Sequence, residues 1–436
     1  MAAEWKQERL DALCEQIADC PHSTPKWTDS GGLVLRSQNI RNGRLDLSAQ
    51  SFTDEAHFEQ RSRRARLRGG DLVITREAPM GEVCLIPEGL RCCLGQRMVM
   101  LRPDENKCDS RFLLYALQSR SVQNEIKVNE GTGSTVSNLR IPLLAALPIP
   151  QPPLGDQRAI ASILGTLDDK IELNRRMNAT LEAMARALFQ SWFVKFDPVR
   201  AKLEGRQPIG MDVETAALFP PVFEDSALGQ IPEGWETGSI LRQAALLSGG
   251  TPKTDVATYW DGDVAWASAK DVSQCGEAFL VATERTITEH GVEQSSTKII
   301  PEFSTVVVAR GATTGRLAMI GHAMAMNQTC YGLHSKFGAP YALYCNANHF
   351  IERVVLGGHG SIFDTITTST FEATDVLLPP RDVVLAFDSQ VGPLFRRILA
   401  NLHQSRTLAE LRNTLLPNLL SGELRIACAS DAPVAV

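Results

Sequence analysis

One stretch of the chain, from Ala159 to Phe193, has the apolar spacing of a long helix that packs along a second helix. Steps of alternately four and three residues connect Ile160, Leu164, Leu167, Ile171, Asn174, Asn178, Leu181, Ala185, Leu188 and Trp192. This period of about 3.5 residues keeps one face of a helix against a partner helix. A polar residue in such a seam fixes register or partner at some cost in stability, so the two asparagines favour a specific pairing.

The same seam occurs a second time, 227 residues further along the chain, at Phe387, Val391, Leu394, Ile398, Asn401, Ser405, Leu408, Arg412, Leu415 and Leu419. Nine of the ten aligned pairs keep their character, and only Ala185 against Arg412 does not. We interpret the chain as an internal duplication. Antiparallel packing of the two seams would bring Asn174 and Asn401 to the middle of the helix pair. Two unrelated amphipathic helices on separate cores are the alternative.

The blocks that precede the two seams also repeat. Thr24-Pro25-Lys26 recurs as Thr251-Pro252-Lys253, and the strand-like run from Leu72 resembles the run from Thr305. In the first block, apolar runs bounded by Gly and Pro predict strands within 33–40, 71–77, 82–86 and 98–103. A helix is predicted from Asp109 to about Lys127, and the Pro-rich residues 148–154 predict a stiff, extended hinge.

These patterns predict an α+β protein with a pseudo-two-fold internal repeat. Two similar globular domains, residues 1–153 and 231–380, are each followed by a long spacer helix, 154–195 and 381–425. The two helices form an antiparallel coiled-coil spacer. Residues 196–230 are predicted to be a connector and residues 426–436 a flexible tail.

Composition limits the class of protein. The ten cysteines are scattered without a CxxC pair or a zinc-like Cys/His cluster, which predicts reduced thiols, a cytoplasmic location and no bound metal. The N-terminus lacks the apolar core of a signal peptide, and no apolar run approaches the length of a membrane span. The net charge of −6 argues weakly against nucleic acid, although local charge patterning matters more than the sum.

Three stretches resemble a known family, the specificity (S) subunits of type I restriction–modification systems. They are PIPQPPLGDQRAIASILGTLDDKIELNRRMNATLEAMARALFQSWFVKFDPVRAKLEGR, GQIPEGWE and TLLPNLLSGEL. The resemblance extends over nearly the whole chain. It implies that each globular block is a target recognition domain reading half of a bipartite site in double-stranded DNA. It also implies that the helices space the domains and dock methyltransferase (M) subunits, two per complex.

The resemblance further implies a non-catalytic chain that works with M subunits and restriction (R) subunits. S-adenosylmethionine, ATP and Mg would then be bound by those partners and not by this chain. The residues agree, since no HExxH, GxSxG or Asp/Asn-Pro-Pro-aromatic motif is present. A stand-alone DNA-binding regulator with two reading heads, or a scaffold that binds no DNA, are the alternative functions.

A cluster of arginines is the first candidate for DNA contact: Arg61, Arg63, Arg64, Arg66 and Arg68. Five guanidinium groups in eight residues suit phosphate contact, which positions a protein without specifying sequence. A solvated helix face with ion pairs to Asp54, Glu55 and Glu59 is the alternative.

Further candidates lie at the ends of predicted strands. Arg76 and Arg310 end strands that we predict to be equivalent, and each could bind guanine bidentately or pair with a carboxylate that braces the turn. Gln96 and Gln328 suit adenine readout or a turn brace. The second block adds Lys253, Lys270, Thr313 and Thr314. For the Gly-rich loops we expect packing against the long helices, at Thr132, Ser134, His359 and Ser361. Three aromatic residues either anchor partner subunits or fill a junction: Phe189, Trp192 and Phe193.

Overall fold

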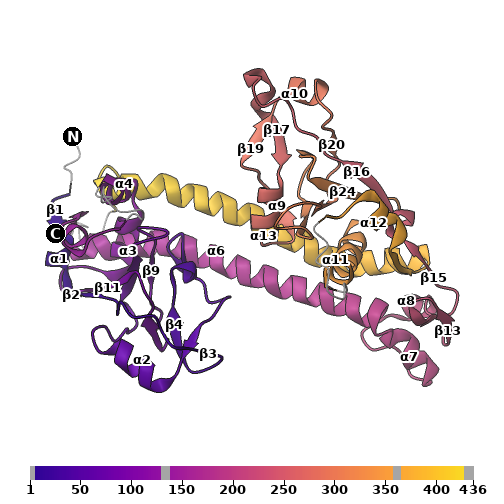
Figure 1. The fold of residues 1–436 in the computed structure, drawn as a ribbon, viewed down its shortest axis with the longest axis horizontal. Helices are drawn as coiled ribbons and strands as arrows, with labels where there is room; N and C mark the ends of the chain where they lie inside the picture. The colour runs from indigo at the N-terminus through magenta and orange to yellow at the C-terminus, as the bar shows by residue number, and fades with distance from the viewer. Residues whose placement is uncertain (1–4, 129–137, 357–364, 427–436) are drawn as a thin grey trace, which may run out of the picture. The chain divides into compact units, whose positions relative to one another are not determined.

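The computed structural model describes residues 5–128, 138–356 and 365–426, which mix helices and strands (Figure 1). The chain forms two compact units. Unit 1 combines residues 1–170 with 407–436, and unit 2 comprises residues 171–406. Each unit therefore contains a length of both long helices, so the predicted domain boundaries do not coincide with the compact units. The predicted α+β class with its two similar globular parts is confirmed.

Unit 1 is built around two four-stranded sheets. The first has the order β2 (Cys14–Asp19), β11 (Met98–Pro103), β8 (Leu72–Thr75), β9 (Val83–Leu85), and its pairs are antiparallel. The second has the order β10 (Cys92–Leu94), β4 (Gly32–Leu35), β7 (Phe52–Thr53), β3 (Trp27–Thr28), with β10 parallel to β4. Two further pairs join β1 (Gln7–Arg9) to β12 (Pro148–Pro150) and β5 (Ile40–Arg41) to β6 (Arg44–Leu45).

The central strand β8 shows why this part of the chain forms a sheet covered on both faces. Leu72 and Ile74 lie in a core with the helices, whereas Val73 lies in a separate core on the other face. Successive side chains of a strand point to opposite faces, so an unbroken apolar run buries both faces. The short helices of this unit are α1 (Leu10–Leu13), α2 (Glu55–Ser62), α3 (Ser110–Gln118), α4 (Arg120–Val128) and α5 (Ile141–Ala145).

Unit 2 repeats this plan. Its first sheet has the order β16 (Ala244–Ser248), β24 (Cys330–Ser335), β21 (Thr305–Val308), β22 (Leu317–Ile320), β18 (Phe279–Leu280). Its second sheet has the order β19 (Arg285–Ile287), β17 (Trp260–Ala267), β23 (Met324–Met326), β20 (Ile299–Ile300), with β17 parallel to β23. The remaining pairs are β15 (Glu236–Ser239) with β25 (Asp375–Leu378) and β13 (Phe223–Ser226) with β14 (Gly229–Pro232).

The matching strand orders confirm the internal duplication. Strands β2, β11, β8 and β9 correspond to β16, β24, β21 and β22, and the parallel pair β4–β10 corresponds to β17–β23. The shorter helices of unit 2 are α7 (Asp197–Leu203), α8 (Val213–Ala217), α9 (Ala269–Gln274), α10 (Glu289–Glu293), α11 (Pro340–Leu356) and α12 (Thr368–Ala373).

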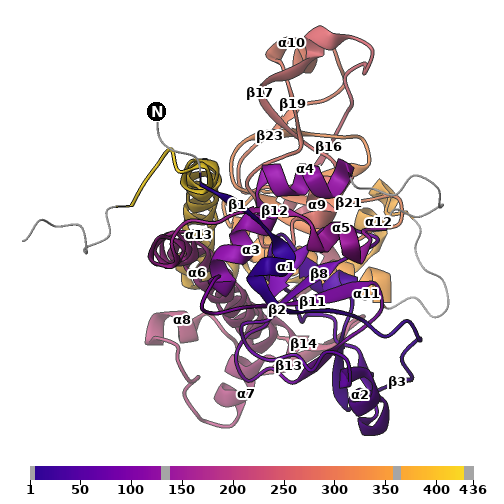
Figure 2. The ribbon, with the colours of Figure 1, turned by 90° about the vertical axis from the view of Figure 1, so that its left-hand side faces the viewer.

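The two long helices are α6 (Leu154–Phe189), which continues into a π-helical turn at Gln190–Val194, and α13 (Arg381–Ser421). Figure 2 shows them side by side. In unit 1, Ile160 shares a core with Leu419, and Asp168 pairs with Arg412 at 2.7 Å. Residue numbers thus rise along α6 as those of its partners fall along α13, which makes the packing antiparallel.

The same direction holds in unit 2, where the seam asparagines meet. Asn401 Nδ2 donates to Asn178 Oδ1 at 2.9 Å, and Asn174 Nδ2 donates to Gln404 Oε1 at 2.9 Å. Asn174 also approaches the Asn401 carbonyl oxygen at 3.4 Å. All other seam positions are buried or half-buried: Ile160, Leu164, Leu167, Ile171, Leu181, Ala185, Leu188 and Trp192 on α6, and Phe387, Val391, Leu394, Ile398, Ser405, Leu408, Arg412, Leu415 and Leu419 on α13.

A polar side chain from each long helix docks a shorter helix within the same unit. In unit 1, Gln157 accepts from the backbone N–H of Asp109, just before α3, and donates to Lys107 O and Pro152 O. In unit 2, Asp388 Oδ1 accepts from the first backbone N–H groups of α11, at Tyr341 (2.8 Å) and Ala342 (2.9 Å). Such caps satisfy helix N–H groups that have no partner within the helix.

Three local predictions need correction. The helix expected from Asp109 to Lys127 is divided into α3 and α4, because Ser119 is extended and its hydroxyl oxygen accepts from the Val122 N–H. The expected hinge begins as strand β12, which pairs with β1. The expected connector 196–230 is part of the unit 2 core, where Val199 and Phe219 are fully buried.

The aromatic residues at the end of α6 fill a junction. Phe189, Trp192 and Phe193 are all buried, and their rings pack against Phe387 of α13. Trp192 also meets Phe219 edge-on at 5.2 Å between ring centroids. The interpretation of these three residues as exposed anchors for a partner is therefore wrong, because all three are buried within unit 2.

Candidate nucleic-acid interface

Three loops of unit 2 and the start of helix α9 meet at one edge of its sheets, which we call the unit 2 loop edge: residues 249–256, 309–316 and 327–329, together with 268–273. Three backbone hydrogen bonds hold them together. Gly250 N donates to Met326 O at 2.9 Å, Asn327 N to Ala267 O at 2.9 Å, and Ala309 N to Thr329 O at 2.8 Å. Loops held by a rigid scaffold are where proteins commonly place binding residues.

The structure brings all six unit 2 candidates to this loop edge. Lys270 pairs with Glu284 at 2.6 Å, and Gln328 contacts the Thr251 hydroxyl. The Thr313 hydroxyl accepts from Ser273 at 2.7 Å, and the Thr314 hydroxyl donates to Gly311 O at 2.7 Å. Lys253 and Arg310 are exposed, and neither side chain has a partner among the residues that the structure describes. These two cations are the ones left available to an anionic ligand.

Unit 1 has a corresponding loop edge, made of residues 20–26, 36–39, 76–81 and 95–97. Gly95 N donates to Leu35 O at 2.8 Å, as Asn327 N does to Ala267 O, and Arg76 N donates to Arg97 O at 2.8 Å, as Ala309 N does to Thr329 O. Gln96 and Gln328 therefore occupy equivalent positions. Gln96 Nε2 donates to His22 O at 2.8 Å, so this exposed amide also braces a turn.

The same bonds confirm that β8 and β21 are equivalent strands, as predicted, but they place the two arginines at positions that differ by one residue. Arg76 corresponds to Ala309, and Arg310 corresponds to Glu77. The Arg76 guanidinium binds Asp19 at 2.9 and 3.0 Å, Asn138 Oδ1 at 3.1 Å and a backbone carbonyl at 2.9 Å. The Arg76 side chain therefore braces the turn, as the alternative interpretation predicted. It is not available to contact a DNA base.

Only Arg61 of the arginine run lies on helix α2, and the other four arginines follow the end of this helix. Arg61 lies on the buried face with Phe58 and is 4% exposed, and it donates to Leu94 O at 3.0 Å and to Ser23 O at 2.9 Å. Burial lowers the pKa of its guanidinium. Its assignment to phosphate contact is wrong, because a residue three positions after Phe58 faces the same side of the helix.

The other members of the run remain on the surface. Arg66 pairs with Glu59, and Arg68 lies 3.5 Å from Glu15 and 4.0 Å from Asp71. Arg63 and Arg64 are exposed, without an ion pair to any described residue. They are the part of this run that still suits phosphate contact.

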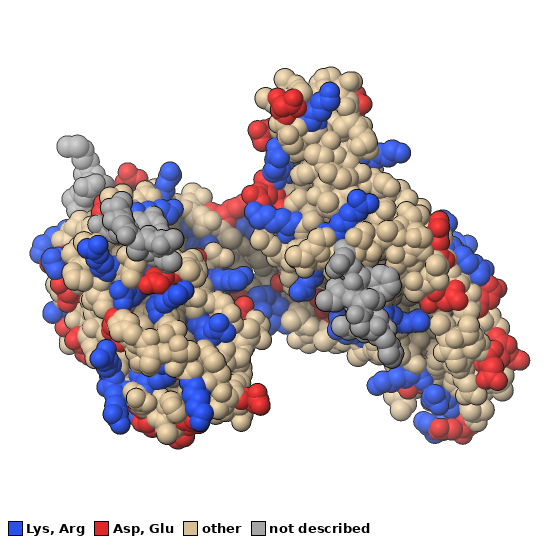
Figure 3. Space-filling view, viewed as in Figure 1, with Lys and Arg blue, Asp and Glu red and all other residues tan. Residues whose placement is uncertain are grey.

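Charge at the unit 1 loop edge is largely neutralised within the unit. Lys26 lies 3.5 Å from Asp54, and hydrogen bonds from His57 lower the pKa of Asp54 to about 2. Arg97 pairs with Glu77 at 3.1 Å. Figure 3 accordingly shows Lys and Arg interspersed with Asp and Glu on this face of both units, not one uniformly basic surface.

Sequence reasoning missed a set of exposed unit 1 residues at this edge. Trp27 is 46% exposed, with the Arg36 guanidinium 5.4 Å from its ring centroid. Gln38, Arg41 and Asn42 line a hollow of about 380 Å³. The repeat could have identified Gln38, because the segment after β4 corresponds to the segment after β17, in which Lys270 lies on α9. Thr132, Ser134, His359 and Ser361 lie outside the described residues.

The side chains and helices of the described residues also limit the class of site. None of their His, Cys, Asp and Glu side chains form a group of three that could hold a metal ion. None of the helices in these ranges is long and apolar enough to cross a membrane.

The two units together define a class of protein: an internally duplicated α+β chain whose halves carry corresponding loop edges and share two antiparallel helices. A family model described as the type I restriction modification DNA specificity domain matches residues 22–183 and again residues 232–383. The chain therefore belongs to the type I restriction–modification DNA specificity family, as the resemblance predicted.

Curated relatives agree in name and extent. The chain is 26% identical to the type I restriction enzyme HindI specificity subunit of Haemophilus influenzae, over 75% of this chain and 80% of that protein. It is 24% identical to the MjaIX specificity subunit of Methanocaldococcus jannaschii, over 82% and 78% of the two chains. A crystal structure of a type I S subunit from M. genitalium has a TM-score of 0.56 at 15% identity over 96% of both chains, which supports the fold.

Proposed function

We propose that each unit reads one half of a bipartite site in double-stranded DNA through its loop edge. The observation that carries this proposal is the recurrence of the loop edge in both units of a chain from a DNA specificity family. Two equivalent readers related by an internal repeat suit a duplex, whose two strands run in opposite directions. Half-sites on one face of DNA recur about 34–36 Å apart, one helical turn.

Within this proposal, the candidates divide by the contact that they suit. The exposed Lys253, Arg63 and Arg64 suit phosphates, which position the protein on the duplex. Arg310 suits bidentate contact with guanine, and Gln328 suits adenine. The net charge of −6 fits a subunit whose partners supply much of the phosphate contact.

We further propose that this chain is non-catalytic and acts in a complex. Two M subunits would carry S-adenosylmethionine and the methyl transfer, and R subunits would use ATP and Mg for cleavage. The long helices would dock the M subunits through an apolar stripe on α6, made of Leu173, Met177 and Met184, that belongs to none of the hydrophobic cores of the described residues. These positions lie on one helix face, and Leu173 and Met184 are 51% and 49% exposed.

An exchange of readers tests the proposal. Residues 1–150 would be replaced by the corresponding block of a relative with a different target, and methylated sites would be mapped by sequencing. We expect one half of the recognised sequence to change and the other half to stay. An unchanged first half would contradict the assignment of unit 1 as a reader and favour a scaffold. Tight, specific DNA binding by the chain without M subunits would instead favour a stand-alone regulator.

A further inference from the structure

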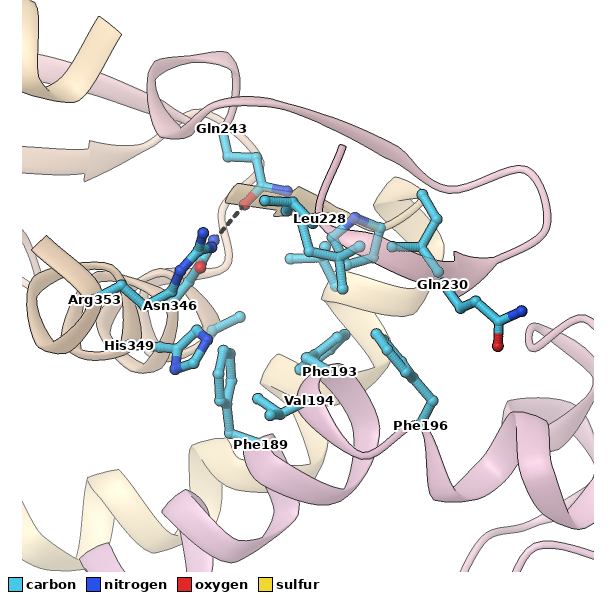
Figure 4. Close-up of a pocket in the computed structure, with 15 residues that line it drawn as sticks. Phe189, Phe193, Val194, Phe196, Leu228, Gln230, Gln243, Asn346, His349 and Arg353 are labelled. Atoms are coloured by element: carbon cyan, nitrogen blue, oxygen red, sulfur yellow. Dashed lines mark hydrogen bonds between the residues drawn. The ribbon is translucent and has the colours of Figure 1, made fainter. Parts of the chain in front are cut away.

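Unit 2 contains a cavity of about 310 Å³ beside the end of α6, away from the loop edge (Figure 4). One wall is aromatic and consists of Phe189, Phe193 and Phe196 from the end of α6 and the turn into α7. The opposite wall carries polar side chains. Gln243 follows a 3-10 turn at Ile240–Arg242, and Asn346, His349 and Arg353 come from α11.

The polar wall contains a buried donor without an acceptor. Gln243 is 7% exposed, and its Oε1 accepts from Asn346 Nδ2 at 3.2 Å. Its Nε2 has no hydrogen-bond partner anywhere in residues 5–128, 138–356 and 365–426. A buried polar group without a partner is unfavourable, and a ligand that supplies an acceptor would satisfy it.

The other polar groups on this wall favour a negatively charged acceptor. Arg353 is exposed and donates from Nη1 to Asp375 O at 3.2 Å, which leaves its other N–H groups for a ligand. His349 Nδ1 also has no partner in the described part of the chain. Burial lowers the pKa of His349, so its ring is neutral at pH 7 and can accept or donate one hydrogen bond.

We propose that this cavity binds a small organic acid with an aromatic or aliphatic body. The carboxylate would accept from Gln243 Nε2 and Arg353, and the body would lie against the three phenylalanine rings. A purely apolar occupant, such as a side chain of a partner protein, would leave the Gln243 N–H unpaired. The volume equals that of about ten water molecules, which suits a ligand of roughly 10–15 non-hydrogen atoms.

The position of the cavity gives such a ligand a structural effect. It lies between the end of the long helix α6 and the sheet-bearing part of unit 2, because Ile231 and Leu377 also line it. A bound acid would therefore tie the α6 end to β14 and β25. A ligand that binds only the folded state stabilises that state. Above Kd, the stabilisation grows with the logarithm of the ligand concentration.

Ligand-observed NMR and thermal unfolding of the full chain test this proposal with 3-phenylpropanoate and octanoate. The neutral 3-phenylpropanamide serves as the uncharged comparison. We expect both acids to bind with Kd of about 1 mM or tighter and to raise Tm, and the amide to bind several-fold more weakly. Gln243→Glu keeps the acceptor for Asn346 but replaces the donor with a negative charge, so it should weaken acid binding at least about tenfold.

Gln230→Glu is the matched control, since Gln230 is exposed at the rim and its amide points away from the cavity in Figure 4. It should change affinity less than about twofold. Arg353 lies on the surface, so the Arg353→Gln variant should fold even if the Gln243→Glu variant does not. It should weaken binding of the acids about fivefold. Three results would overturn the proposal. They are the absence of binding by both acids, equal effects of the Gln243 and Gln230 variants on affinity, and unchanged affinity of the Arg353→Gln variant. A fourth such result is binding by the amide as tight as by the acid.

Discussion

Arg310 and Arg76 show how a shift of one residue decides the role of a side chain. Arg76 directly follows β8 and turns inward to Asp19, whereas Arg310 lies one position further from the equivalent strand and is exposed. Successive residues of an extended chain point to opposite sides, so one position exchanges an internal brace for a solvent-facing cation. The two arginines look alike in sequence because each ends a strand-like run.

Arg310→Ala should therefore weaken DNA binding while leaving the fold intact. We expect a loss of about 1–3 kcal/mol in the affinity of the assembled methyltransferase for its cognate duplex, because a bidentate contact with guanine would be removed. Fluorescence anisotropy at fixed salt measures this loss. Arg206→Ala is the control, since Arg206 is exposed and paired only with Glu204 in the connector. Equal affinity of the two variants would show that Arg310 does not contact DNA.

The seam asparagines carry a second prediction at this scale. Asn401→Leu removes the donor to Asn178 from a position that is 2% exposed, so an amide oxygen loses its partner inside the helix pair. We expect the free energy of unfolding to fall by about 1–3 kcal/mol, measured by urea denaturation of the full chain.

The control replaces an exposed amide side chain outside the seam of the same helix, as in Gln390→Leu, which should change stability by less than about 0.5 kcal/mol. A cost for Asn401→Leu as small as that of the control would mean that the amide contacts contribute nothing to the pairing of α6 and α13.

Glu277 provides a prediction about pH. It is largely buried, and desolvation raises the pKa of its carboxyl, although a hydrogen bond from Asn178 at 3.4 Å opposes the shift. A raised pKa means that the folded state binds the proton more tightly than the unfolded state, so ionised Glu277 destabilises the fold at neutral pH. Glu277→Gln should raise Tm at pH 7, and this gain should vanish as pH falls below the ordinary glutamate pKa of 4.5.

Thermal unfolding at a series of pH values measures the effect of Glu277→Gln. Glu293→Gln is the control, because Glu293 is exposed on α10, and its effect on Tm should be small. A gain for Glu277→Gln that persists unchanged at low pH would show that the carboxylate charge is not its cause.

At the scale of elements, helix α6 carries apolar residues on two faces, and only one of these faces packs against α13. The seam through Asn174 and Leu181 is covered by α13, whereas the stripe through Leu173 and Met184 belongs to none of the hydrophobic cores of the described residues. A helix with apolar residues on two faces is typical of a bundle with more than two helices. The further helices would come from M subunits under the proposed function.

The double variant Leu173→Glu/Met184→Glu should therefore prevent assembly with M subunits. Two charges placed in an apolar interface are expected to weaken association by at least about 100-fold, with little change in Tm of the chain alone. Analytical ultracentrifugation of mixed subunits measures assembly. Ala179→Glu, on another exposed face of the same helix, should assemble normally. Normal assembly of the double variant would place the docking surface elsewhere.

Element boundaries show where local sequence information ends. The period of the seam predicts α6 and α13 well, because each turn repeats the same apolar signal over 36 and 41 residues. The division of α3 from α4 depends on one serine, and the packing of residues 196–230 depends on a core that those residues meet only after folding. Proline and glycine in that segment indicated a linker, although they here end short helices and strands.

At the scale of the whole molecule, both long helices contribute to both units. Under the proposed function, inserting one heptad into each helix, after Lys170 and after Arg406, should lengthen both by about 10 Å at 1.5 Å per residue. A heptad keeps the seam in register, so the helix pair should survive. We expect the unread gap between half-sites to widen by about three base pairs with both half-sites intact, as mapped by methylation sequencing. A four-residue insertion breaks the seam and should abolish methylation, and an unaltered gap after the heptad insertion would refute the spacer role.

The sequence alone determined the duplication, the antiparallel helix pair, the α+β class and the family. These properties follow from patterns that repeat many times, so an error at one position does not change the result. Only the tertiary structure decided which cations are available: Arg61 and Arg76 turn inward, whereas Arg63, Lys253 and Arg310 do not. The physical reason is that a shift of one residue along a strand, or of about 100° around a helix, separates a buried side chain from an exposed one. The residues that bury a given side chain come from distant parts of the chain, so local sequence does not show them.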